Sequence, residues 1–172
     1  CIRDSFGDGI VGADGSLDRQ AVAAIVFSDE AELKALNGIV HPAVGAEIKA
    51  RQDALRETDT IVVLDIPLLV RADGEKGRRK EYEHLLGVVV VDTDPEVAVA
   101  RLMEHRGFSE ADARSRLANQ ASRDDRLAVA DHIIDNSGAV DALEPQLDAC
   151  WAWMQAVATA NARAAASITT ND

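Results

Sequence analysis

The stretch GVVVVDTDPEVA, residues 87–98, decides the fold of this chain. Four valines between a glycine and an aspartate form a continuous apolar run, which is typical of a strand buried in a parallel sheet. Asp94 can then cap a helix and Pro95 suits its first position, so we expect a helix over residues 95–105. The stretch predicts a strand that passes directly into a helix, the repeating unit of α/β folds.

Two further short apolar runs extend this sheet. Residues 60–65 (TIVVLD) and 132–135 (HIID) are rich in β-branched residues, and both end in aspartate. Strands that alternate with helices predict an α/β fold with a parallel sheet. Ligands of such folds bind beyond the carboxyl ends of the strands, which are marked here by Asp65, Asp92 and Asp135-Asn136.

Helix signals dominate the rest of the chain. Ser16 is a plausible N-cap, Asn37-Gly38 is a typical helix stop, and His41-Pro42 places a proline near a helix start. Helices are expected over residues 16–27, 28–37, 42–57 and 139–165, with a loop over residues 1–15.

Composition narrows the class of protein. The 172 residues are 47% hydrophobic and carry a formal charge of −12. This acidic balance argues against the broad basic surface with which proteins bind nucleic acids. No apolar run approaches the ~20 residues of a membrane helix, and no leader opens the chain. Cys1 and Cys150 lie in no metal or redox motif, and Cys150 is expected to be buried. We expect a cytoplasmic protein that binds neither nucleic acid nor membrane.

An arginine cluster stands out against this acidic background. Residues 114–138 (RSRLANQASRDDRLAVADHIIDNSG) contain four arginines and no lysine. Guanidinium groups bind phosphates through two parallel hydrogen bonds. The cluster favours a compact polyphosphate ligand over a nucleic acid.

On one continuous helix, Arg116, Gln120 and Arg123 would share a face, since they lie at i, i+4 and i+7. Such a row suits a mobile lid over a nucleotide. The alternative is a solvated helix whose arginines pair with nearby aspartates, and the pattern leaves both interpretations open.

Two carboxylate motifs allow other chemistry. Asp65 at a strand end could hold Mg²⁺, or it could cap a helix or anchor a loop. Asp92-Thr93-Asp94 resembles the nucleophile motif of haloacid-dehalogenase-type phosphatases. However, Pro95-Glu96 replace the expected Gly-Thr, and Asp94 fits an ordinary N-cap.

Five segments in register resemble dephospho-CoA kinases, a family of P-loop kinases. They are DGSLDRQAVAAIVFSD (14–29), LNGIVHPAV (36–44), IPLLV (66–70), VVVVDTDPEVAVARLMEHRG (88–107) and QASRDDRLAVADHIIDNSG (120–138). The resemblance spans about residues 1–155 and implies a three-layer α/β fold of the P-loop kinase type. It further implies one domain over residues 1–165, with a helical acceptor region at about 16–57, a lid at about 106–128 and a tail at 166–172.

The resemblance also implies a reaction and a set of residue roles. The family transfers the γ-phosphoryl group of ATP to the 3′-hydroxyl of dephospho-CoA, with Mg²⁺. Arg116, Gln120 and Arg123 would contact ATP phosphates from the lid, and Asn136 would lie near the adenine. The acceptor side would include His41, Pro67 and Leu68, and Asp65 would help to organise Mg²⁺.

Two departures from the family pattern matter. Arg71 stands where the family places a glutamate, and the 172 residues contain no G-x-x-x-x-G-K-[ST] motif. We expect that the P-loop and the catalytic base precede Cys1, and that these 172 residues alone have little kinase activity. A non-catalytic module that binds a nucleotide or a partner is the alternative.

Overall fold

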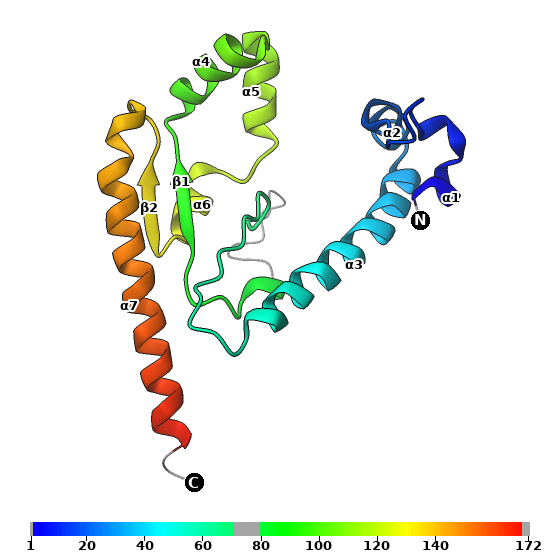
Figure 1. Cartoon of the computed structure of the whole chain (residues 1–172). Helices are drawn as coiled ribbons and strands as arrows, with labels where there is room; N and C mark the ends of the chain where they lie inside the picture. The colour runs from blue at the N-terminus through cyan, green and yellow to red at the C-terminus, as the bar shows by residue number, and fades with distance from the viewer. Residues whose placement is uncertain (1, 71–79, 170–172) are drawn as a thin grey trace. The chain divides into compact units, whose positions relative to one another are not determined.

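The computed structural model describes residues 2–70 and 80–169. The chain divides into two compact units, Cys1–Val62 and Val63–Asp172, and each is described by itself (Figure 1). Arg71 and the tail beyond residue 169 lie outside the described residues. In the part of the chain that the structure describes, no helix combines the length and apolar character needed to cross a membrane.

The first unit is helical, as the sequence predicts. Its elements are α1 (Ile2–Phe6), a 3₁₀ turn η1 (Asp8–Ile10), α2 (Arg19–Val26) and α3 (Glu30–Leu55). Its core consists of Ile10, Val22 and Val26, against which partly buried side chains of α1 and α3 pack. The expected loop over residues 1–15 therefore contains a short helix.

The cap of α2 differs from the prediction. Asp18, not Ser16, accepts hydrogen bonds from the backbone N–H groups of Gln20 and Ala21, at 2.9 and 3.0 Å. Ser16 instead donates its hydroxyl to Asp14 Oδ1 at 2.7 Å. The serine stabilises the preceding turn, and the helix begins three residues later than expected.

The two helices predicted over residues 28–37 and 42–57 form one helix. α3 spans 26 residues, continues through Gly38 and contains Pro42 in its interior. A proline in a helix costs about 3 kcal/mol and a glycine about 1 kcal/mol relative to alanine. Good helix formers on both sides of Asn37-Gly38 outweigh these costs, so the stop signals are wrong here.

The strand predicted over residues 60–65 does not form. These residues are irregular, and the side chains of Val62 and Val63 are exposed. A strand needs a neighbour to pair its backbone N–H and C=O groups. No strand in the described residues pairs with this segment, so its β-branched composition alone does not make it a strand.

The second unit contains a parallel pair of strands. β1 (Val89–Asp92) pairs with β2 (His132–Asp135) in the register Val89–His132 to Asp92–Asp135. Its other elements are η2 (Lys80–Tyr82), α4 (Pro95–Arg106), α5 (Glu110–Ala118), α6 (Arg123–Ala128), η3 (Val140–Ala142) and α7 (Glu144–Thr169). The predicted strands at 87–92 and 132–135 are confirmed, and the fold is α/β with a parallel sheet.

Helices α6 and α7 pack against β1 and β2 respectively, and α4 packs against α5 (Figure 1). Trp153 of α7 stacks on His132 of β2 with ring centroids 5.4 Å apart. Trp151 is about half exposed, whereas Cys150 is buried as predicted. Burial raises the pKa of the Cys150 thiol.

Candidate functional site

The candidate site lies where the two strands end. Asp92 closes β1 opposite Asp135, the last residue of β2. The backbone N–H of Asn136 donates to the carbonyl of Asp92 at 2.7 Å, which extends the pairing by one step. The sequence predicts Asp65, Asp92 and Asp135-Asn136 as strand ends. The register places Asp92 beside Asp135, whereas no strand forms at Asp65.

Asp92 is the one buried charged side chain among the described residues, with 5% of its surface exposed. Arg123 at the start of α6 reaches it across the strand end. Its Nε lies 2.9 Å from Oδ2 and 3.1 Å from Oδ1, and its Nη2 lies 2.6 Å from Oδ2. Because a buried carboxylate requires such partners, this pair fixes α6 against β1.

Arg123 retains binding capacity after pairing with Asp92. Its side chain is 43% exposed. The hydrogen bonds and the charge of Asp92 raise the pKa of the guanidinium, so it stays charged. A guanidinium has five N–H donors, and in the described part of the chain no acceptor is bonded to Nη1.

The backbone after β2 is held by several contacts. The N–H of Asp94 donates to Ser137 Oγ at 2.8 Å, which ties the start of α4 to this loop. The N–H of Ser137 donates to Asp135 Oδ1 at 2.8 Å, and hydrogen bonds from Ser137 hold the pKa of Asp135 below its usual value. Arg101 of α4 donates to the carbonyls of Asn136 and Gly138.

Sequence reasoning missed Arg101 and also Gln146. Arg101 lies 35 residues before Asn136, and Gln146 lies 11 residues after Asp135. No local pattern links residues at these separations, so only the fold shows that they contact the same loop.

The predicted lid is two helices rather than one. α5 ends at Ala118, Gln120 lies exposed in the connection, and Arg123 begins α6. The expectation that Arg116, Gln120 and Arg123 share one helix face is therefore wrong. Ser122 explains the break: its hydroxyl accepts the N–H of Asp125 at 3.0 Å and donates to the Asp125 carboxylate at 2.6 Å.

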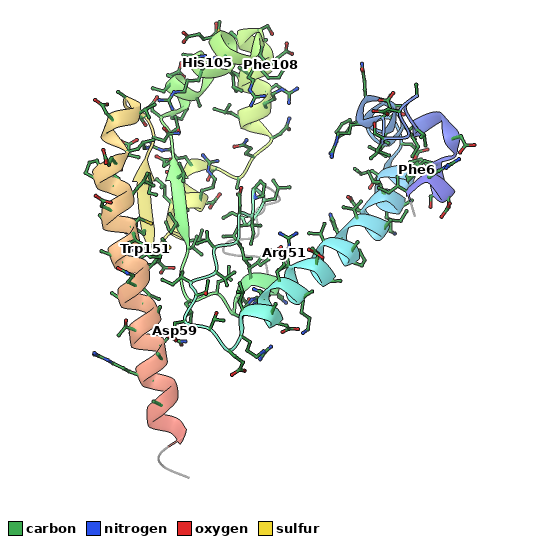
Figure 2. The ribbon with its side chains drawn as sticks, in the orientation of Figure 1. Phe6, Arg51, Asp59, His105, Phe108 and Trp151 are labelled. Carbon is green, nitrogen blue, oxygen red and sulfur yellow. The ribbon has the colours of Figure 1, made fainter. Side chains whose placement is uncertain are left out.

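The lid arginines differ in their surroundings. Arg116 of α5 lies over the ring of Phe108, 4.2 Å from its centroid. Phe108 itself lies in the connection between α4 and α5 (Figure 2). Arg114 forms two 2.8 Å hydrogen bonds with Glu96 and one of 2.9 Å with Glu110. The interpretation as paired surface arginines therefore describes Arg114, with glutamates as its partners.

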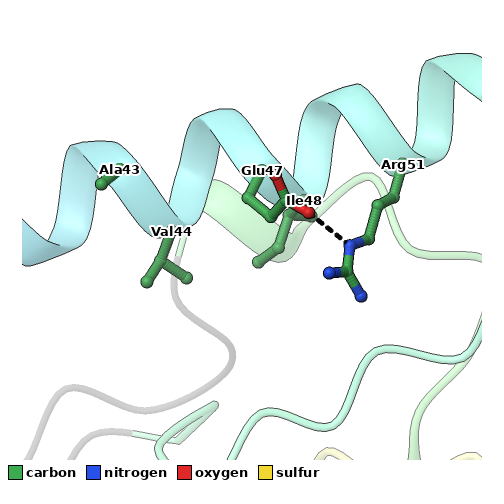
Figure 3. Close-up of a pocket in the computed structure, with 5 residues that line it drawn as sticks. All are labelled: Ala43, Val44, Glu47, Ile48 and Arg51. Atoms are coloured by element: carbon green, nitrogen blue, oxygen red, sulfur yellow. Dashed lines mark hydrogen bonds and ion pairs between the residues drawn. The ribbon is translucent and has the colours of Figure 1, made fainter. Parts of the chain in front are cut away.

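The residues expected on the acceptor side are exposed. His41 lies on α3, and Pro67 and Leu68 form part of a turn in the other unit. On α3 itself, Ala43, Val44, Glu47, Ile48 and Arg51 line an open hollow of ≈ 380 Å³ (Figure 3). Arg51 donates to Glu47 at 2.7 Å within it.

Among the described residues the carboxylates form no preassembled metal cluster, and those of the D-x-D motif have other partners. Among residues 2–70 and 80–169, no three His, Cys, Asp or Glu side chains gather as a metal site, and Asp65 is exposed in the irregular segment. Asp92 is occupied by Arg123, and Asp94 caps α4 by accepting the N–H of Glu96 at 2.9 Å. This geometry leaves neither aspartate of the D-x-D motif free to act as a phosphatase nucleophile or acid.

A parallel strand pair with polar groups at both carboxyl ends, faced by an arginine, is the place at which α/β proteins bind their ligands. Comparison with known proteins identifies the family. The family model for dephospho-CoA kinase matches residues 1–142, and the chain belongs to this family.

Relatives and solved structures agree with this assignment. A dephospho-CoA kinase of Leifsonia xyli is 42% identical over 156 residues, which cover 90% of this chain and 75% of the relative. A crystal structure of a Thermus thermophilus protein is 32% identical with a TM-score of 0.66, covering 88% of this chain and 73% of its own. The dephospho-CoA kinase of Campylobacter jejuni is 26% identical with a TM-score of 0.60, covering 93% and 75%.

Proposed function

We propose that this chain contributes the lid and the nucleotide-base side of an ATP-dependent dephospho-CoA kinase. The reaction transfers the γ-phosphoryl group of ATP to the 3′-hydroxyl of dephospho-CoA, in the cytoplasm. The supporting observation is Arg123, which is anchored to buried Asp92 at the strand end while part of its guanidinium stays exposed. Family membership supplies the reaction type.

Arg123 is proposed to contact the ATP phosphates. Asp92 holds the Nε and Nη2 donors, which fixes the plane of the guanidinium, and Nη1 remains available for a phosphoryl oxygen. A preorganised positive charge stabilises the charge that develops on the transferring group. Arg116 and Gln120 are proposed as further phosphate contacts, each from its own segment of the lid.

The adenine and the acceptor are assigned to other residues. Asn136 is proposed to contact the base, because a side-chain amide offers both a donor and an acceptor to the edge of adenine. His41, Pro67 and Leu68 are proposed to contact the acceptor.

Magnesium is proposed as the counter-ion of ATP. Mg²⁺ is usually held by one or two carboxylates together with substrate phosphates, so one exposed carboxylate such as Asp65 fits this arrangement. A bound ion would neutralise negative charge on the phosphates of ATP. The 172 residues contain no G-x-x-x-x-G-K-[ST] motif, so we propose that they are weakly active unless a P-loop is supplied.

The test uses the full-length protein that contains these residues. The assay measures the release of ADP from ATP that accompanies the consumption of dephospho-CoA. Arg123→Lys keeps a positive charge beside Asp92 but loses the guanidinium fork, and we expect kcat/KM for ATP to fall about 100-fold. Arg163→Lys is the control, because Arg163 is an exposed arginine on α7, outside the proposed lid.

The results separate the possible functions. Full activity of Arg123→Lys would refute the role of Arg123, and the absence of any phosphorylated product from the wild type would refute the kinase assignment. Binding of ATP without transfer by the full-length protein would support the non-catalytic module instead.

A further inference from the structure

Two long polar side chains, from α4 and α7, hold the loop that follows β2. From α4, the two terminal nitrogens of Arg101 donate to two carbonyls on either side of Ser137, those of Asn136 and of Gly138, the latter at 2.8 Å. The Arg101 side chain is partly buried. A rigid planar guanidinium that spans two carbonyls sets the distance and orientation between them.

Gln146 of α7 holds the other end of the same loop. Its Oε1 accepts the N–H of Asp135 at 2.8 Å, and its Nε2 donates to the carbonyl of Asp135 at 3.0 Å. Nε2 also donates to the carbonyl of Ala142 at 2.9 Å. The amide of Gln146 therefore replaces a neighbouring strand at the end of β2.

These contacts leave the side-chain amide of Asn136 available. Within residues 2–70 and 80–169, the side-chain amide of Asn136 takes part in no hydrogen bond, although the residue is half-buried. Its backbone N–H is used by Asp92 and its carbonyl by Arg101. The backbone of Asn136 is thus fixed on both sides, while its amide stays free to bind.

We propose that Arg101 is a positioning residue for recognition of the nucleotide base: it fixes residues 136–138 so that the Asn136 amide meets the edge of adenine. This proposal rests on the proposed function above. Because a base edge is read by paired donors and acceptors, a small shift of the amide affects discrimination between adenine and guanine more than it affects phosphoryl transfer.

The test compares variants of the full-length protein in steady-state kinetics with ATP and with GTP. Arg101→Lys keeps the charge but cannot span two carbonyls. Arg163→Lys is the control, because Arg163 is an exposed arginine on α7 outside both the lid and the loop. For Arg101→Lys we expect the KM for ATP to rise about tenfold and the preference for ATP over GTP to fall about tenfold. We expect kcat and the KM for dephospho-CoA to change less than about twofold.

A second variant keeps the test independent of one side chain. Gln146→Met removes the hydrogen bonds to Asp135 at similar side-chain volume. We expect the same shift in nucleotide preference as in Arg101→Lys. Thermal melting checks that both variants fold. Unchanged preference in both variants, or a loss of kcat with KM and preference unchanged, would overturn the proposal.

Failure of the proposed function gives a different result. If the wild type phosphorylates no dephospho-CoA, calorimetric titration of the wild type and the same variants with ATP and GTP tests the positioning role of Arg101 directly. A wild-type preference for ATP that Arg101→Lys loses supports the positioning role, and equal nucleotide binding by wild type and variant overturns it.

Discussion

Replacing Gly87 by alanine tests the packing beneath β1. A Cβ atom on residue 87 would lie 2.6 Å from Cη2 and 2.9 Å from Cζ2 of Trp153, closer than real Cβ atoms come to other side chains. The indole cannot readily withdraw, because it stacks on His132. Something at this contact must therefore shift in the variant.

The expected magnitude follows from two opposing effects. Overpacking of a well-packed site costs about 1–3 kcal/mol. Alanine also restricts the unfolded chain relative to glycine, which stabilises the protein by about 0.4–1 kcal/mol. We expect Gly87→Ala to lower the free energy of unfolding by about 1–2 kcal/mol.

Urea unfolding of the full-length protein, followed by tryptophan fluorescence, measures this loss. Gly138→Ala is the matched control, since its new Cβ would meet Ala142 Cβ at an ordinary 3.8 Å, and we expect a change within about 0.5 kcal/mol. Trp153→Phe removes the clashing ring edge, so Gly87→Ala should cost less in that background. An equal loss in both backgrounds would refute the packing argument.

Three further predictions concern stability. Pro42→Ala in the interior of α3 should stabilise that helix by up to about 3 kcal/mol, and an unchanged or lower melting temperature would contradict it. Ser122→Ala removes the hydroxyl that caps α6 by accepting the N–H of Asp125, and it should lower the free energy of unfolding by about 1 kcal/mol. Ser122→Asp keeps a capping oxygen and should lower it little. In a Cys1→Ser background, Cys150 should react with a disulfide reagent only after unfolding. The pKa of this thiol is raised in the folded state. Its contribution to stability is therefore present below the pKa of the unfolded thiol and is lost as pH rises through the folded pKa. The urea concentration at the unfolding midpoint should fall over that alkaline range.

The features predicted correctly from the sequence are local ones. The valine run before Asp92 and the Asp94-Pro95 pair specify β1 and α4 within about a dozen residues, and Gly107 ends α4 in a left-handed conformation with φ 66°. Ser109 caps α5 in the same local way, accepting the N–H of Asp112 at 3.1 Å. Each of these signals acts through neighbours in the chain, so the sequence contains it directly.

The failures have three physical causes. Residues 60–65 have strand composition, but a strand also needs a partner, which composition does not supply. The stop signals at Gly38 and Pro42 carry a cost that surrounding helix formers can exceed. The break between α5 and α6 has its own local signal, because Ser122 followed three residues later by Asp125 is a capping pattern that starts a new helix.

The site itself was predicted only in part. Asp92 and Asp135 were identified correctly as strand ends, and they are adjacent because parallel strands end at the same edge of a sheet. The pairing of Arg123 with Asp92 joins residues 31 positions apart, and the supports from Arg101 and Gln146 are likewise non-local. The sequence indicated the residue types of the site, whereas the fold decides which of them touch.

The crossover between β1 and β2 also has a consequence for how the protein folds. The backbone N–H of Val88 donates to the carboxylate of Asp131, 43 residues later in the chain. No hydrogen bond between the two strands can therefore form until a long loop closes. The helices inside that loop carry their own caps and can form first, which shortens the chain that remains to be closed. Since the entropic cost of closure grows only with the logarithm of loop length, extra residues inserted between α5 and α6 should slow folding only slightly. The crossover can therefore vary in length during evolution while the strand register at Asp92 and Asp135 is preserved.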